Sequence, residues 1–322
     1  MSSTLELSTA VTSDSLRGLL PATVTPFADD LSLDEAALAR HLKAVAEADG
    51  VAGLVVNGHI GEICALTPEE QAQCVRIARE VALPGQFVIS GVESRTARGL
   101  VSAGEAARDA GADGLLVLPP LDMRAYRRLC AHPPALLHYI SALESDVGLP
   151  MILHQYPKFT GAAYSFGVLD AVVDIPLVVG LKAAAFTVTH YAEIWDAFHS
   201  RVAVLASTDA PSLLGMMLHG THGSLIGIGV IAPEVWAGVL RAAQEGRGEE
   251  ARQIFNTQCL PLLAAVFQNQ EPTTLVSEAS ATKEALAQLG QLTNSLVRPP
   301  SVGVDGPASA AIRDALMRAR LL

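Results

Sequence analysis

The chain has 322 residues, of which 50% are hydrophobic and only 17% are charged, so its composition suits a protein with a large core. The formal net charge of −11 argues against a nucleic-acid surface, which needs clustered lysine and arginine. No apolar run approaches the roughly 18–20 residues that cross a bilayer, so no membrane partner is expected. The N-terminus has no basic stretch followed by an apolar one, which favours a cytoplasmic location.

Strand-like runs rich in valine, isoleucine and leucine alternate with amphipathic helical patterns along the chain. The first run, Gly18–Thr25, stops at Pro26, and Asp34 then predicts the N-cap of a helix. The second run, Gly53–Asn57, precedes a helix start at Thr67 that has proline in its first position and acids in its first turn. Six further strands are predicted at Gln86–Val92, Gly114–Leu118, Met151–Tyr156, Leu177–Ala183, Arg201–Ser207 and Ser224–Ile228.

Eight strands that alternate with helices predict an α/β protein with a parallel sheet. Their number favours a closed (β/α)8 TIM barrel over a doubly wound sheet, and no G-x-G-x-x-G motif follows the first strand. We expect a flexible N-terminal segment over residues 1–16, the barrel over 17–246, and a C-terminal helical region over 247–322 that packs on the barrel. Between the fourth and fifth strands, Pro133-Pro134 is expected to break or kink the helical stretch 124–147.

Lys182 lies in an apolar run, with Leu177–Leu181 before it and three alanines after it. Inside a barrel strand, desolvation disfavours the ammonium and lowers the pKa of a lysine toward that of a nucleophilic amine. Such an amine condenses with a ketone to give an iminium ion. The positive nitrogen of the iminium can accept the electron pair of a bond that breaks at the adjacent carbon. The alternative is a lysine at the strand end whose ammonium reaches solvent.

Two other features belong with the carboxyl ends of the strands, where the active site of such a barrel lies. His154 and Tyr156 are two residues apart on the fifth strand, so both side chains share a face and could move protons beside Lys182. They could equally be core residues with satisfied hydrogen bonds. Gly58 and Gly61 bracket a turn whose N–H groups can hold a carboxylate or phosphate. The nine histidines show no ligand spacing and the four cysteines no C-x-x-C pair, so we expect no metal, cofactor or disulfide.

Five segments carry a resemblance to known proteins: GLLPATVTPF (18–27), NGHIGEICALTPEE (57–70), AGADGLLVLPP (110–120), HQYPKFTG (154–161) and VVGLKAA (178–184). Their order and spacing resemble the dihydrodipicolinate synthase / N-acetylneuraminate lyase family of Schiff-base aldolases and dehydratases, over about residues 17–290. The resemblance implies that Lys182 is the Schiff-base residue and that the chain forms a homotetramer or homodimer.

The chain departs from the family's pattern around the substrate. The proton-relaying tyrosine of the family aligns with His154, and its paired tyrosines align with Leu121 and Asp122. The arginine that clamps the second substrate's carboxylate in the synthase aligns with Phe159, which offers no such fork of donors. A less polar second-substrate pocket is therefore expected. The predicted substrate-binding residues are Gly58, His59, Ile60, Gly61, Asp122, Phe159 and Leu225, where His59 and Ile60 replace two threonines of the family.

The leading hypothesis is a Schiff-base lyase, either an aldolase or a dehydratase, that acts on pyruvate or a larger 2-oxo acid. Lys182, His154 and Tyr156 are its predicted catalytic residues. One alternative is dihydrodipicolinate synthase activity with an altered proton relay. Another is a 2-oxo-acid-binding regulator that has lost turnover, although a binding module has little need for a desolvated lysine.

Overall fold

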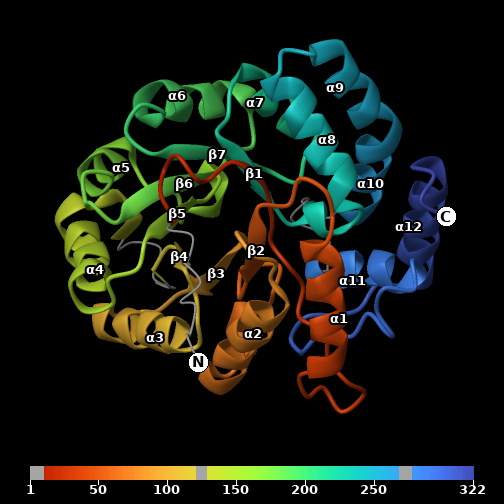
Figure 1. Ribbon diagram of the computed structural model, residues 1–322, viewed down its shortest axis with the longest axis horizontal. Coiled ribbons are helices and arrows are strands. Elements are labelled where there is room, and N and C mark those ends of the chain that lie inside the picture. The colour runs from red at the N-terminus through yellow and green to blue at the C-terminus, as the bar shows by residue number, and fades with distance from the viewer. Residues whose placement is uncertain (1–10, 121–128, 268–277) are drawn as a thin grey trace, which may run out of the picture.

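The computed structural model describes residues 11–120, 129–267 and 278–322, except for the side chain of Phe159. Its strands form one parallel sheet in the order β1-β8-β7-β6-β5-β4-β3-β2, and bridges from Leu19 to Val51 and from Ala22 to Val55 close it between β1 and β2. Figure 1 shows the helices arranged around this barrel, so the predicted (β/α)8 fold is confirmed. The strands are β1 (Gly18–Pro21), β2 (Gly53–Val56), β3 (Phe87–Val92), β4 (Gly114–Val117), β5 (Met151–Gln155), β6 (Val178–Ala184), β7 (Ala203–Ser207) and β8 (Gly223–Ile226).

Every predicted strand is present, and the largest difference is at β1, which ends at Pro21 and not at Thr25. All but three of the strand residues are buried, because the barrel interior covers one face and the helices cover the other. This explains why the strands are continuous apolar runs in the sequence rather than alternating ones.

Five of the eight barrel helices begin at a residue whose side chain caps them. Asp34 accepts a hydrogen bond from the Ala37 N–H at 2.9 Å, as predicted, and at the predicted helix start Thr67 forms a capping box with Glu70. The predicted break at Pro133-Pro134 is present: a 3-10 turn at Leu129–Ala131 ends before Pro133, and Pro133 begins the next helix, whose first turn needs no N–H donor there. The barrel helices are α1 (Glu35–Ala46), α2 (Pro68–Val81), α3 (Ala97–Asp109), α4 (Pro133–Asp146), α5 (Phe166–Val172), α6 (Val188–Phe198), α7 (Ser212–His219) and α8 (Pro233–Gln244).

The amino-terminal end of the barrel is covered by residues 11–16. Val11 and Leu16 are buried, and the Ser13 hydroxyl donates to the Val179 carbonyl at 2.8 Å. The described part of the predicted N-terminal segment therefore packs on the barrel, while residues 1–10 lie outside the description.

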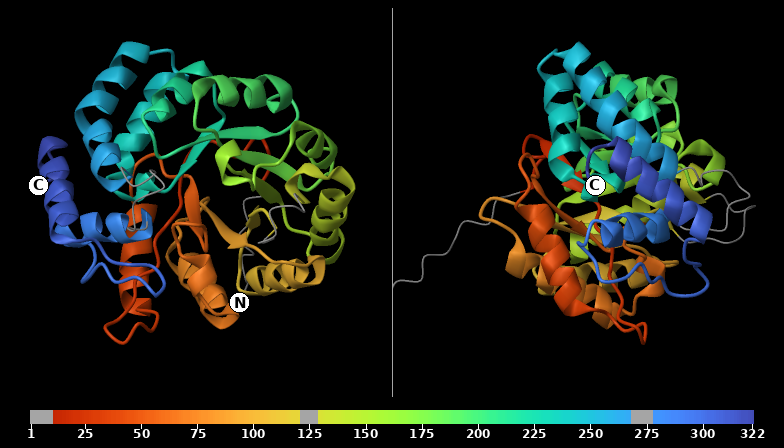
Figure 2. Two further views of the ribbon diagram at one scale, coloured as in Figure 1. Left: turned by 180° about the vertical axis from the view of Figure 1, so that it is seen from behind. Right: turned by 90° about the vertical axis from the view of Figure 1, so that its right-hand side faces the viewer.

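The C-terminal helices gather at one edge of the barrel (Figure 2). They are α9 (Gly248–Ile254), α10 (Leu260–Val266), α11 (Glu278–Gln288) and α12 (Gly306–Arg318). From α11, the fully buried Lys283 pairs with Glu62 in the loop after β2 and donates to the Leu296 carbonyl at 2.8 Å. Its ammonium also lies 4.2 Å from the ring centre of Phe27. This helix thus contacts the end of the barrel where the strands finish. Over the described residues, no helix has the length and apolar character needed to cross a membrane.

Candidate active site

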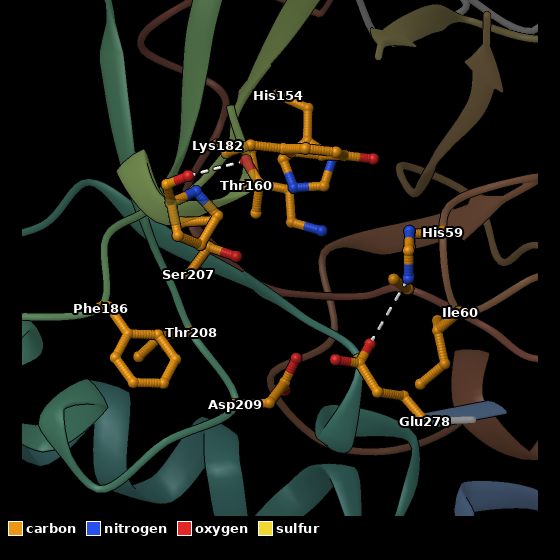
Figure 3. Close-up of a pocket in the computed structure, with 15 residues that line it drawn as sticks. His59, Ile60, His154, Thr160, Lys182, Phe186, Ser207, Thr208, Asp209 and Glu278 are labelled. Atoms are coloured by element: carbon orange, nitrogen blue, oxygen red, sulfur yellow. Dashed lines mark hydrogen bonds and ion pairs between the residues drawn. The ribbon is translucent and has the colours of Figure 1, made fainter. Parts of the chain in front are cut away.

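A cavity of about 310 Å³ opens at the carboxyl ends of the strands (Figure 3). This is the end at which barrels of this class carry their active sites. Side chains from five of the strand ends and one C-terminal helix reach it. The lining residues are Ala22, His59, Ile60, His154, Tyr156, Pro157, Thr160, Lys182, Ala184, Phe186, Ser207, Thr208, Asp209, Gly227 and Glu278.

Lys182 stands at the centre of this cavity on β6. Its register partners are His154 on β5 and Leu205 on β7, and the residue is 8% exposed. Burial lowers the pKa of the Lys182 ammonium to about 8, although the carboxyl groups of Asp209 and Glu278 oppose that shift. Near neutral pH, a larger fraction of the molecules than for an exposed lysine therefore has Lys182 as the free, nucleophilic amine.

His154 and Tyr156 both line the cavity, as the two-residue spacing predicted. Their ring centres lie 4.3 Å apart with the planes at 81°, an edge-to-face contact. Within the described part of the chain, the buried His154 Nδ1 has no hydrogen-bond partner. Burial, followed by the charge of Lys182, holds the pKa of His154 well below its usual range, and burial raises the pKa of Tyr156. His154 is thus a neutral imidazole and Tyr156 a neutral phenol at neutral pH.

The turn between β2 and α2 has the geometry of an anion-binding loop. Asn57 and Glu62 flank it with φ angles of 56° and 57°, in the left-handed region. A Cβ on Gly61 would lie 3.0 Å from the Thr23 carbonyl oxygen, so the chain passes too close there for a side chain. No hydrogen bond between described residues uses the N–H groups of His59 and Ile60, which leaves them for a ligand. Of the predicted turn residues, His59 and Ile60 line the cavity, and Gly58 and Gly61 shape the backbone.

Two carboxyl groups that were not among the predicted site residues also face the cavity. Asp209 follows β7, where its Oδ1 accepts from the Ile228 N–H at 3.0 Å, and burial raises its pKa to about 6. Glu278 is the first residue of α11, and its Oε2 lies 3.8 Å from His59 Nε2. The sequence does mark Asp209 as one of the polar residues that follow the seventh predicted strand, Ser207 to Asp209, although it was not assigned a role. Nothing local marks Glu278, because a distant C-terminal helix brings it to the site.

Of four further predicted residues, only Leu225 can be placed, and the predictions for the other three stay predictions. Leu121 and Asp122 lie outside the described residues, as does the side chain of Phe159, whose backbone follows β5 in a short 3-10 turn. Leu225 is fully buried on β8 opposite Leu20 and does not line the cavity. The prediction that Leu225 contacts substrate is therefore not supported, because its strand position turns it into the packed core.

The model of the Dihydrodipicolinate synthetase family matches residues 15–319. A 4-hydroxy-tetrahydrodipicolinate synthase of Phenylobacterium zucineum is 31% identical over 309 residues, which cover 93% of this chain and 97% of that protein. Among solved structures, a dihydrodipicolinate synthase of Acinetobacter baumannii in complex with pyruvate has a TM-score of 0.83 at 26% identity, with 95% of this chain and all of that chain covered. The E. coli K12 prophage protein YagE, also in complex with pyruvate, has a TM-score of 0.83 at 25% identity, with 95% and 99% covered.

Proposed function

Because the chain belongs to the dihydrodipicolinate synthetase family, whose members are lysine Schiff-base lyases, we propose that it acts on pyruvate or a larger 2-oxo acid through Lys182. One observation carries the proposal. The Lys182 amine lies in a cavity beside a neutral imidazole and a turn with unused N–H groups. These are the three functions that imine formation with a 2-oxo acid requires: a nucleophile, a proton carrier and a carboxylate site.

The reaction begins when the Lys182 amine adds to the keto carbon. The N–H groups of His59 and Ile60 bind the adjacent carboxylate. His154 carries a proton to the leaving hydroxyl, water departs, and an iminium forms. Loss of a proton from the neighbouring carbon gives an enamine. This carbon then attacks an aldehyde, whose oxygen takes up a proton, and water hydrolyses the imine to release a 4-hydroxy-2-oxo acid and the free lysine. The reverse sequence is aldol cleavage. The dehydratase alternative begins with the same iminium, formed from a 3-deoxy-2-oxo acid, which then loses water.

Borohydride trapping tests the proposal directly. The enzyme is incubated with pyruvate, reduced with borohydride, and digested for peptide mass analysis. We expect a reduced pyruvate adduct on Lys182 and none in Lys182→Met, which keeps the length of the side chain but has no amine. Absence of an adduct from the native enzyme would contradict the proposed chemistry.

A second candidate function is 4-hydroxy-tetrahydrodipicolinate synthase activity itself, with His154 in the place of the family's relay tyrosine. The names of the relatives favour it. An assay with pyruvate and aspartate semialdehyde separates it from other aldol reactions. The regulator hypothesis would be favoured only if pyruvate bound and no 2-oxo acid were turned over.

The predicted homotetramer or homodimer and the predicted cytoplasmic location are not tested by the single chain. Light scattering on the purified protein would measure its mass in solution. Fractionation of the source cells would establish the compartment.

A further inference from the structure

Lys283 on α11 does not line the cavity, but its side chain is bound to the turn that follows β2. In the proposed function, the N–H groups of His59 and Ile60 hold the carboxylate of a 2-oxo acid. Resting on that function, we propose that Lys283 is a positioning residue for this carboxylate site and that it acts through Glu62, at the end of the turn. The C-terminal helical region is then part of the binding machinery as well as a cover for the barrel.

Both ends of the turn have an unusual backbone conformation, and they are held in different ways. Asn57 and Glu62 have φ angles of 56° and 57°. Asparagine tolerates this left-handed region, and the Asn57 side chain is anchored in the barrel, where it donates to the Gln71 carbonyl at 2.9 Å and to the Ser90 hydroxyl at 3.0 Å. A glutamate does not favour this region, so the surroundings of Glu62 must hold it there.

The backbone of Glu62 is coupled directly to the proposed carboxylate site. The Glu62 N–H donates to the His59 carbonyl at 3.0 Å and closes the turn. That carbonyl belongs to the same planar peptide group as the Ile60 N–H, so its hydrogen bond sets the direction in which the Ile60 N–H points. A change of φ at Glu62 would therefore reorient a donor that the carboxylate needs.

The side chain of Glu62 is held in place by Lys283. The two form an ion pair, and both side chains are almost completely buried. Lys283 is itself fixed, because its ammonium donates to the Leu296 carbonyl at 2.8 Å and lies 4.2 Å from the ring centre of Phe27. The Glu62 carboxylate cannot move away without leaving a buried charge unpaired, which is strongly unfavourable.

Arg298, also from the C-terminal region, holds the residues that follow Glu62. Its guanidinium donates to the Ala65 carbonyl at 2.8 Å and binds both oxygens of the Glu70 carboxylate at the start of α2. The chain after Glu62 is thus fixed. If Glu62 were released, its motion would pass to the other side, toward the proposed carboxylate site.

Loss of the ion pair should weaken carboxylate binding without slowing the chemistry at Lys182. A residue other than glycine disfavours the left-handed conformation by a factor of about 5 to 30 when nothing holds it there. Only the molecules that keep this conformation at position 62 would bind the carboxylate well. The apparent dissociation constant rises in inverse proportion to that fraction.

Two double variants isolate this role. Lys283→Met/Glu62→Gln and Lys283→Met/Glu62→Gly both remove the ion pair and leave no buried charge unpaired, so neither should suffer the full loss of stability of Lys283→Met alone. They differ because glycine adopts the left-handed conformation freely and glutamine does not. Borohydride trapping over a range of pyruvate concentrations gives the half-saturating concentration and the limiting rate of adduct formation on Lys182.

We expect the half-saturating pyruvate concentration to rise about 5- to 30-fold in Lys283→Met/Glu62→Gln, with the limiting rate unchanged. Lys283→Met/Glu62→Gly should recover most of this loss. Urea denaturation of both variants shows whether affinity merely follows stability, as a purely structural role of the pair would require.

A second ketone and a second site provide the controls. Acetone forms an imine but has no carboxylate, so its rate of adduct formation should be the same in the native enzyme and in both double variants. Ile194→Ala truncates a fully buried side chain on α6, which lies across the barrel from α11 (Figure 1). It should lower stability and leave the half-saturating pyruvate concentration unchanged.

Native-like pyruvate affinity in Lys283→Met/Glu62→Gln would overturn the inference. Equal losses of affinity in the two double variants would do so too, as would a parallel slowing of the reaction with acetone. A native enzyme that forms no pyruvate adduct would overturn the proposed function, and this inference with it.

Discussion

His154 and Lys182 lie opposite each other across the β5–β6 ladder, and both side chains line the same cavity. Neighbouring parallel strands are about 4.8 Å apart, so residues in register present their side chains side by side on one face. The sheet itself therefore places the imidazole of His154 next to the amine of Lys182. Packing by the barrel, and not a flexible loop, sets the distance between the two groups.

The rate of imine formation should rise with pH. Since burial lowers the pKa of Lys182 to about 8, the fraction of free amine falls tenfold for each pH unit below that value and levels off above it. The initial rate of pyruvate adduct formation, measured from pH 6 to 10, should follow this curve. Asp209 opposes the shift, so Asp209→Asn should move the midpoint to lower pH. A midpoint near 10.5, the ordinary lysine value, would contradict the desolvated amine.

Replacement of His154 by phenylalanine should separate chemistry from binding. An aromatic ring is kept, although a slightly larger one, and both nitrogens are lost. We expect turnover to fall by about 10²- to 10⁴-fold, the usual contribution of a positioned acid–base group, while the pyruvate adduct still forms slowly. Steady-state kinetics and borohydride trapping are measured on the same preparation. Unchanged turnover would remove His154 from the reaction.

The pair between Lys283 and Glu62 should be critical to stability. Both side chains are almost completely buried, so Lys283→Met would leave a carboxylate uncompensated and cost about 3–5 kcal/mol of the free energy of unfolding. Urea denaturation measures this loss. The double variant with Glu62→Gln should recover much of it, because the orphaned charge is gone. Lys43→Met, which breaks only the exposed pair with Glu47, is the matched control and should change stability little.

Asp209 should make the protein less stable as pH rises. The pKa of Asp209 is raised in the folded state from 3.8 to about 6, so folding favours the protonated acid. This contribution is fully present below pH 3.8 and is lost as pH rises through 6, up to a limit of about 3 kcal/mol for a shift of this size. Asp209→Asn should therefore stabilise the protein more at pH 8 than at pH 4. Equal effects at both pH values would show that the carboxyl group is not desolvated.

Gly91 on β3 should not tolerate a side chain. A Cβ at this position would lie 1.8 Å from the carbonyl oxygen of Asn57, which begins the anion-binding turn. Gly91→Ala must displace β2 or β3. We expect either insoluble protein or a decrease of about 1–3 kcal/mol in the free energy of unfolding, as in other overpacked cores. Gly167→Ala on α5 is the matched control, because a Cβ there meets nothing within 4 Å. A stable and active Gly91→Ala variant would contradict this packing.

The fold could be predicted from local patterns in the sequence. Each parallel strand is buried on both faces, so it had to be a short apolar run, and the capping residues Asp34 and Thr67 marked the starts of two helices. Pro133 fits the same pattern, because a proline that breaks a helix interior also suits the first turn, where α4 begins.

By itself, the sequence determined the barrel and marked Lys182, His154 and Tyr156 as candidate site residues, since these depend on spacing within single strands. Only the tertiary structure decided that Glu278 reaches the same cavity as Asp209 and that Leu225 does not. A strand's period tells which residues share a face, but not which face lines the cavity. Nor does any local pattern show that a helix some 100 residues after Lys182 in the sequence returns to the ends of the strands. The candidate nucleophile is therefore a property of one segment, whereas the cavity that surrounds it is a property of the folded chain.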